Sequence, residues 1–212
     1  MNRGRVIFLV RHGETEWNRD RRYQGWLDSP LTPEGIAQAE AIGRLLRLLP
    51  EAAEAAIVAS PLGRARHTAN IIAECLRDEN GHRRLVCFDE RLREISLGSW
   101  DGLDKREIRR RAPELFAGEG GRWEWYFRSP DGETYDEFAG RLAAWLADLG
   151  PGPVIAVAHG VVTRILRGLY AGLPRAAALR LAVPQDRLFL LQGGTITEIA
   201  ASPTQEPEMH RF

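Results

Sequence analysis

The stretches Val10-Arg11-His12-Gly13 and Ala158-His159-Gly160 decide the fold. Each closes a short apolar run rich in branched residues, Arg5–Val10 in the first case and Val154–Ala158 in the second. Runs of this length and composition are typical of buried strands. A histidine followed by a glycine therefore stands where each of two separate predicted strands leaves the sheet.

Two further apolar runs indicate additional strands. Ala56–Ala59 ends in Ser60-Pro61-Leu62-Gly63-Arg64, and Leu85–Phe88 lies shortly before Glu94. Both runs are four residues long, which fits strands buried inside a sheet. We therefore expect four strands whose carboxyl ends carry polar or charged residues.

Helical periodicity fills the intervals between these strands. Thr32 is a suitable N-cap with Pro33 at the first helical position, and Thr134 with Glu137 has the spacing of a capping box. The predicted helices follow Thr32, Ser60-Pro61 (as far as about Arg77), Thr134 and His159-Gly160.

A two-residue hairpin is predicted near the end of the chain. Arg187–Gln192 and Thr195–Ala200 flank Gly193-Gly194, and the second of these strands would lie antiparallel at a sheet edge. Strands that alternate with helices imply an α/β fold, here a three-layer α/β/α sandwich with a mainly parallel sheet. We expect one domain over residues 1–202, with residues 203–212 as a flexible tail.

The composition excludes several classes of function. Basic and acidic residues balance at 29 each, so no global charge attracts nucleic acid or an anionic membrane. The apolar run Val6–Val10 is too short for a signal-peptide core or a membrane span, and we expect a cytoplasmic protein. The two cysteines, Cys75 and Cys87, form no disulfide or metal pattern and are expected to be core residues.

The strand ends predict a phosphoryl-transfer site. Ligands of open parallel sheets bind at the carboxyl ends of the strands. Arg11 and Arg64 supply planar donors for phosphate oxygens, and the backbone at Gly160 adds an N–H group at a helix start. His12 must be neutral to attack phosphorus, and neighbouring arginines are expected to lower its pKa. Glu94 is the candidate acid for the leaving oxygen, and no metal or cofactor is required.

Several ordered motifs of this sequence resemble those of the histidine phosphatase superfamily, which has the phosphoglycerate mutase-like fold. Together the motifs span roughly residues 5 to 175, and their number and order make the resemblance specific. They are Arg11-His12-Gly13-Glu14-Thr15-Glu16-Trp17-Asn18, Gln24-Gly25-Trp26-Leu27-Asp28-Ser29-Pro30-Leu31-Thr32, Ser60-Pro61-Leu62-Gly63-Arg64-Ala65, Leu92-x-Glu94-x-x-x-Gly98-x-Trp100-Asp101-Gly102, Pro130-Asp131-Gly132-Glu133-Thr134 and Ala158-His159-Gly160.

The resemblance implies a role for each matching residue. The histidine matching His12 forms a phosphohistidine, and the glutamate matching Glu94 donates and accepts the proton. The phosphoryl group is held by the positions matching Arg11, Arg64 and His159. The residues implied to bind substrate are Arg11, Asn18, Gln24, Gly25, Arg64, Glu94, His159 and Gly160.

This chain departs from the family pattern at two positions. Val161 stands where many relatives have a second glycine after the histidine, so the backbone approach there is open to change. Asp101 replaces the more usual glutamate after the tryptophan, and we interpret this change as structural. Competing residues lie close to two site positions: Arg66 and His67 beside Arg64, and Glu90 and Glu133 for Glu94.

Hydrolysis of phosphate monoesters of a small metabolite is the leading interpretation. A phosphoglycerate mutase-type transfer is the alternative; the glycolytic mutases of the family tend to have a larger insertion before the third helix, where this chain is short. A non-catalytic phosphate-binding or scaffolding protein is the alternative from another class. The sequence leaves open the natural substrate, a homodimer, and whether Trp123–Phe127 packs in the core or faces the substrate.

Overall fold

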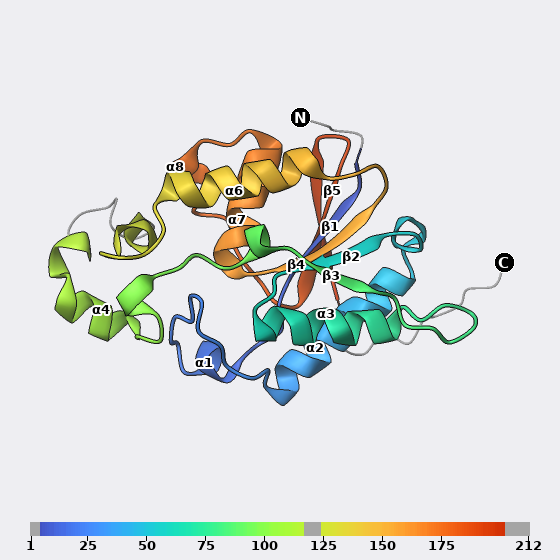
Figure 1. Ribbon diagram of the computed structural model, residues 1–212, viewed down its shortest axis with the longest axis horizontal. Helices are drawn as coiled ribbons and strands as arrows, with labels where there is room; N and C mark the ends of the chain where they lie inside the picture. Colours follow the sequence, from blue (N-terminus) through green and yellow to red (C-terminus); the bar gives the residue numbers. More distant parts are fainter. Residues whose placement is uncertain (1–4, 117–123, 202–212) are drawn as a thin grey trace.

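A computed structural model describes residues 5–116 and 124–201 of the chain. Its centre is a six-stranded sheet with the strand order β3-β2-β4-β1-β5-β6 (Figure 1). The strands β1, β2, β3 and β4 run parallel, β5 pairs antiparallel with β1, and β6 pairs antiparallel with β5 at the edge. Their bounds are Ile7–Arg11 (β1), Ala56–Ala59 (β2), Val86–Phe88 (β3), Val154–Ala158 (β4), Arg187–Gln192 (β5) and Thr195–Ala200 (β6).

The predicted helices all form, and short ones join them. The second predicted helix ends at Cys75 rather than near Arg77. Side-chain caps explain the two best-defined starts: Thr32 accepts the N–H of Gly35, and Thr134 forms a complete capping box with Glu137. The helices are α1 (Glu16–Arg19), α2 (Pro33–Arg47), α3 (Gly63–Cys75), α4 (Lys105–Arg111), α6 (Tyr135–Asp148), α7 (Gly160–Ala171) and α8 (Arg175–Ala178).

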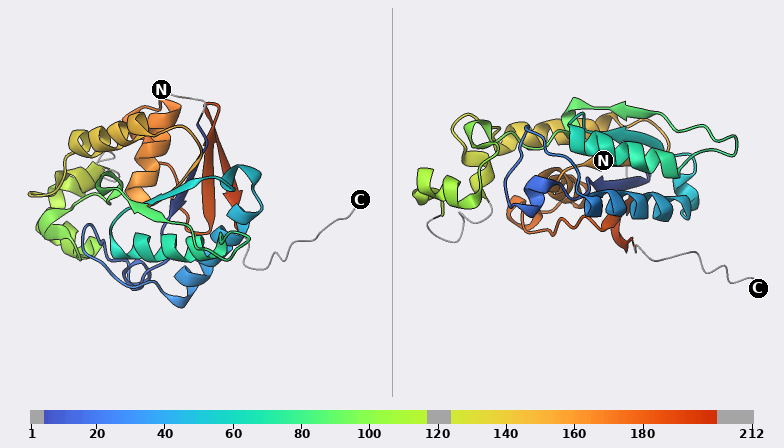
Figure 2. Two further views of the ribbon diagram at one scale, coloured as in Figure 1. Left: turned by 45° about the vertical axis from the view of Figure 1, so that its right-hand side comes forward. Right: turned by 90° about the horizontal axis from the view of Figure 1, so that it is seen from below.

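Helices cover both faces of the sheet, as Figures 1 and 2 show. Alternate side chains of β1 point to opposite faces. Phe8 packs in the core that includes Ile42 of α2 and Ile72 of α3, while Leu9 packs in the core that includes Phe138 of α6. This arrangement confirms the predicted three-layer α/β/α sandwich.

The segment between β3 and α6 extends to one end of the molecule, where α4 lies (Figure 1). An isolated bridge joins Asp104, the N-cap of α4, to Arg22 just after α1. Residues far apart in the sequence therefore meet beside the carboxyl ends of the parallel strands.

The core prediction for Cys87 is wrong. Cys87 is exposed because it lies on β3, a three-residue strand at the edge of the sheet, and Cys75 at the end of α3 is only half-buried. The predicted tail, residues 203–212, lies outside the described residues, and the single-domain assignment over 1–202 stays a prediction. In the two described ranges, none of the helices combines the length and apolar character that a bilayer crossing requires.

The contribution of the α6 layer to the stability of the fold can be measured by removing a large core side chain. Trp145 on α6 is 2% exposed, and we expect Trp145→Ala to lower the free energy of unfolding by about 3–5 kcal/mol through transfer and cavity terms. Urea denaturation followed by circular dichroism measures the change. Leu85→Ala, at a side chain exposed to 87%, is the control and should shift stability by less than about 0.5 kcal/mol. Equal losses in both variants would contradict this account of the core.

Candidate active site

The parallel pairing of β1 with β4 brings the two strand-end histidines together. Arg11 lies opposite Ala158 in the register, and the His12 N–H donates to the Ala158 carbonyl over 3.0 Å. His159 follows Ala158 directly. As a result, the ring centroids of His12 and His159 are 5.2 Å apart, although the residues are far apart in the sequence.

A cavity of about 400 Å³ opens at this edge of the sheet. His159 has no exposed surface and is not among the residues that line it, but its ring packs against that of His12, which does line the cavity. The other predicted site residues all line the cavity: Arg11, His12, Asn18, Gln24, Gly25, Arg64, Glu94 and Gly160.

His12 presents one defined nitrogen to the cavity. Its Nδ1 lies 2.8 Å from the Gly13 carbonyl. A carbonyl can only accept, so Nδ1 carries the proton and, in the neutral ring, Nε2 carries the lone pair. Burial lowers the His12 pKa well below its ordinary value, and the charges of Arg64 and Arg11 lower it further. The predicted direction is confirmed, with burial as the larger cause.

Arg64 is fixed in place by oxygens of one loop. Its Nη2 donates to the Gly25 carbonyl over 2.8 Å, and its Nη1 donates to the Leu27 carbonyl over 2.8 Å and to Asp28 over 3.1 Å. The side chain is buried at the start of α3, and its Nε has no partner in the described part of the chain. Three contacts therefore hold the guanidinium while one buried donor is left for a ligand.

Arg11 is held in the same way from a different segment. Its Nη1 donates to the Val183 carbonyl, and its buried Nε lacks a partner within residues 5–116 and 124–201. A Cβ placed on Gly160 would lie 3.6 Å from that Nε, so the start of α7 is close to it. Burial lowers the Arg11 pKa to about 10, which leaves the side chain charged at neutral pH.

Glu94 lies against the start of α7. Its Oε2 accepts the Val161 N–H over 3.2 Å, and its Oε1 accepts the Ile95 N–H over 3.1 Å. The backbone N–H of Val161 therefore binds Glu94 in spite of the side chain that stands here in place of a second glycine. The Trp26 indole donates to the Glu94 carbonyl over 2.9 Å and fixes the backbone as well.

The competing residues are engaged elsewhere. Glu133 pairs with Arg141 over 2.8 Å, and Glu90 pairs with Arg93 over 2.6 Å. Arg66 lies over the ring of Phe88 on the edge strand β3. None of the four competitors Arg66, His67, Glu90 and Glu133 lines the cavity, whereas Glu94 and Arg64 do.

Gly25 is required by its backbone and by its neighbour. Its φ is +50°, and a Cβ there would lie 1.6 Å from Asp101 Oδ1. Asp101 accepts the N–H groups of Trp26 and Leu97, each over 3.0 Å, and so joins two loops of the site. The interpretation of Asp101 as structural agrees with these contacts.

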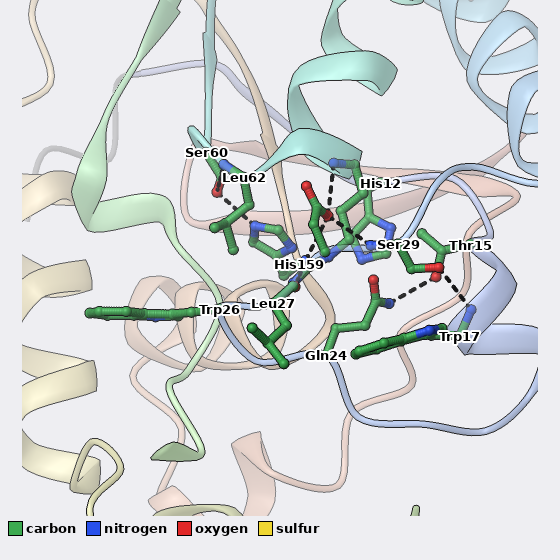
Figure 3. A network of polar contacts seen from close by, with 12 residues as sticks. His12, Thr15, Trp17, Gln24, Trp26, Leu27, Ser29, Ser60, Leu62 and His159 are labelled. Carbon is green, nitrogen blue, oxygen red and sulfur yellow. Dashed lines mark hydrogen bonds and ion pairs between the residues drawn. The ribbon is translucent and has the colours of Figure 1, made fainter. Parts of the chain in front are cut away.

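The positions of Asn18 and Gln24 depend on one hydroxyl. Thr15 Oγ1 accepts the Gln24 side-chain N–H over 2.8 Å (Figure 3). It also accepts the Asn18 backbone N–H over 3.1 Å. The Asn18 side chain in turn accepts from Gln185 over 3.1 Å, and Gln185 also donates to the His12 carbonyl over 3.0 Å. Gln185 was missed by the sequence analysis because it lies in an irregular segment and outside every recognised motif.

The segment that contains Gln185 is held by arginines. Its carbonyl oxygens at three consecutive residues each accept from a different guanidinium: Leu181 from Arg164, Ala182 from Arg167 and Val183 from Arg11. A polar backbone without regular structure is thereby satisfied and fixed next to His12.

The outer wall of the cavity is basic and partly aromatic. Of the aromatic segment, Tyr126 lines the cavity, whereas Trp125 and Phe127 are buried in the core. Trp123 lies outside the described residues. The further cations that line the cavity are Arg21, Arg22, Lys105 and Arg164. Among the described side chains there is no group of three His, Cys, Asp or Glu that could hold a metal ion.

Comparisons with known proteins identify the family to which the chain belongs. The sequence model of the histidine phosphatase superfamily (branch 1) matches residues 7–194. A curated relative from Citrobacter koseri, named "Probable phosphoglycerate mutase GpmB", is 38% identical over 187 residues, which are 82% of this chain and 79% of the relative.

Two solved structures share the fold over most of both chains. Bacillus stearothermophilus YhfR is 32% identical with a TM-score of 0.74, and the match covers 93% of this chain and 96% of that one. A mycobacterial glucosyl-3-phosphoglycerate phosphatase, solved with VO3, is 30% identical with a TM-score of 0.73 and coverages of 93% and 97%.

The buried histidines should make the protein less stable as the pH falls. The pKa values of His12 and His159 lie well below 6.5 in the folded chain and near 6.5 in an unfolded one. Below about pH 6.5 the unfolded state therefore binds more protons, and the free energy of unfolding should fall by up to about 1.4 kcal/mol per pH unit for each histidine.

Urea denaturation at several pH values between about 7.5 and 5 measures this slope. The double variant His12→Gln/His159→Gln should be much less sensitive to pH, whereas His82→Gln, at an exposed histidine, should keep the slope. A slope unchanged in the double variant would show that other groups are responsible.

Proposed function

Because this chain belongs to the histidine phosphatase superfamily, we propose that it hydrolyses phosphate monoesters of a small metabolite through a phosphohistidine on His12. One observation supports this most directly: a buried His12, whose Nδ1 is held by the Gly13 carbonyl, lines one cavity together with two fixed guanidinium groups and the Glu94 carboxylate. These are the groups that phosphoryl transfer to a nitrogen nucleophile needs.

In the first step, Nε2 of His12 attacks phosphorus and the bond to the ester oxygen breaks. Glu94, in its protonated form, gives its proton to the leaving alcohol. Arg11 and Arg64 bind the phosphoryl oxygens through the Nε donors that lack partners in the described protein. His159, which packs against His12, binds the same phosphoryl group.

In the second step, water attacks the phosphorus of the phosphohistidine. Glu94, now a carboxylate, accepts the proton of the water, and the N–P bond breaks with its electron pair returning to His12 Nε2. Inorganic phosphate leaves, His12 is again neutral, and Glu94 is again protonated. No step draws on a group beyond the named side chains and water.

Mutase activity is the second candidate, and the name of the Citrobacter koseri relative favours it. The short segment between Glu94 and α6 supports hydrolysis instead, as does the activity in the name of the mycobacterial phosphatase. We also propose a cytoplasmic location and no nucleic-acid partner; the balance of 29 basic and 29 acidic residues supports the absence of a nucleic-acid partner.

A phosphoenzyme should accumulate during turnover of a 32P-labelled phosphate ester. Rapid quenching should trap a species that is stable to base and labile to acid, as expected for phosphohistidine. His12→Ala should lose this species and at least about 10³-fold in kcat, because it removes the nucleophile. His82→Ala at an exposed site is the control and should behave as the wild type. Trapping of label in His12→Ala would contradict the assignment.

The general-acid role of Glu94 should depend on the leaving group. Glu94→Gln keeps the shape but cannot donate a proton, and we expect kcat to fall by about 10²–10⁴-fold with an alkyl phosphate. The loss should be smaller with p-nitrophenyl phosphate, whose leaving group needs little protonation. Glu90→Gln, at a glutamate outside the cavity, is the matched control. Equal losses with both substrates would argue against proton donation by Glu94.

Product analysis distinguishes the two candidate activities. A phosphatase should release inorganic phosphate from p-nitrophenyl phosphate and from metabolite esters. A mutase should interconvert 2- and 3-phosphoglycerate after priming with 2,3-bisphosphoglycerate and release little phosphate. Efficient interconversion would replace hydrolysis with mutase activity as the function.

A further inference from the structure

Ser60 contacts the second histidine of the site. It directly follows β2, and its N–H donates to the Val157 carbonyl of β4 over 3.0 Å. This pairing places its hydroxyl 2.7 Å from His159 Nε2, and both residues have no exposed surface (Figure 3). The phosphoryl-transfer steps above do not use Ser60, so this buried contact with His159 requires another explanation.

The direction of the Ser60–His159 hydrogen bond follows from the single proton of the Ser60 hydroxyl, which needs a buried acceptor. The Leu62 N–H, which can only donate, points at the same Ser60 oxygen over 3.3 Å. The hydroxyl has one proton, and among the described residues His159 Nε2 is the acceptor within reach of it. Ser60 therefore donates to Nε2, and the proton of a neutral His159 is on Nδ1.

His159 is neutral in the resting protein. Burial lowers its pKa well below the ordinary value, and the charge of Arg64 lowers it further. A neutral imidazole has one N–H and one lone pair, so its tautomer decides whether it offers a donor or an acceptor at a given place. In this protein the hydrogen bond from Ser60 determines the tautomer of His159.

The Nδ1 of His159 is a buried polar atom without a partner in the described residues. Figure 3 shows it on the side of the ring toward His12, the nucleophile of the proposed reaction. The ring centroids are 5.2 Å apart and His12 lines the cavity, so this nitrogen lies close to the side chain that the proposed reaction phosphorylates. A buried N–H that lacks a partner is costly unless a ligand oxygen completes it.

We propose that Ser60 is a positioning residue that fixes His159 as the Nδ1–H tautomer, so that this N–H donates to a phosphoryl oxygen. The opposite tautomer would direct a lone pair at an anionic oxygen and repel it. The inference rests on the proposed phosphoryl-transfer function, because it needs an anion between the two histidines.

Nitrogen NMR of the full-length protein with 15N-labelled histidine tests the tautomer without any kinetic assumption. His159→Gln assigns the signals. At a pH near 7.5, Nδ1 of His159 should be protonated and Nε2 unprotonated, and inorganic phosphate should shift the Nδ1–H signal. Protonation of Nε2 in the wild-type protein without ligand would overturn the proposal, whatever the enzymatic activity is.

Ser60→Ala tests the consequence for catalysis. Loss of the hydroxyl should produce a mixture of His159 tautomers and lower kcat for p-nitrophenyl phosphate by about tenfold, the effect of one lost net hydrogen bond. Ser60→Thr keeps the hydroxyl and should restore both the tautomer and most of the activity. An unchanged tautomer and unchanged kcat in Ser60→Ala would overturn the proposal.

Ser29→Ala is the matched control for a purely structural effect. Ser29 is also buried, and its hydroxyl accepts one backbone N–H, that of Trp17 over 3.1 Å, but it contacts no histidine. This variant should keep the His159 tautomer and remain within about twofold of wild-type kcat, since a single capping contact is modest. An equal loss of kcat in both alanine variants would assign the effect of Ser60 to packing and overturn its positioning role. A wild-type protein without phosphatase activity would contradict the proposed function, while the NMR result would still decide the tautomer.

Discussion

The parallel pairing of β1 with β4 is the interaction on which the site depends. The register sets Arg11 opposite Ala158, and the bond from His12 to Ala158 continues it one residue past the strand. A shift of one residue would turn the side chains of β1 to the opposite faces and separate the histidines. The register is held because both faces of β1 are buried, Ile7 and Leu9 on one side and Phe8 on the other.

Burial is the second constraint, and it acts on histidine and arginine in different ways. It lowers the pKa of both types, but the histidines become neutral while Arg11, with a pKa of about 10, stays charged at neutral pH. The same environment therefore yields an uncharged imidazole next to cations. Carbonyl oxygens and the Asp28 carboxylate around Arg64 compensate for part of the cost of burying its charge.

The positive charge that faces the cavity comes from a local group of side chains and not from the net charge of the chain. The formal net charge is zero, yet the cavity wall carries several guanidinium groups and Lys105. The segment with Gln185 is part of this organisation, since arginines bind its carbonyl oxygens while Gln185 binds the backbone of His12. Fixed donors of this kind need little rearrangement when an anion binds.

The strands, the main helices and the residues at the strand ends could all be predicted from the order of the amino acids. Apolar runs, the caps at Thr32 and Thr134 and the glycine pair of the hairpin are local signals, and each acts within a few residues of its position. Strand ends in a parallel sheet share one edge, so the meeting of His12, Arg64 and His159 followed from the same reading. The chemical roles of these residues stay predictions that the experiments above can test.

Only the tertiary structure decided the contacts of Gln185, the hydroxyl of Ser60 next to His159, and which aromatic residue faces the cavity. Ser60 and His159 are 99 residues apart, and Gln185 binds His12 across 173 residues. Tyr126 and Trp125 are neighbours in sequence, yet one lines the cavity and the other is in the core. Such contacts depend on how distant segments pack, and a serine, a glutamine or a tyrosine carries no local signal of the partner that packing will bring to it, so no local pattern identifies them.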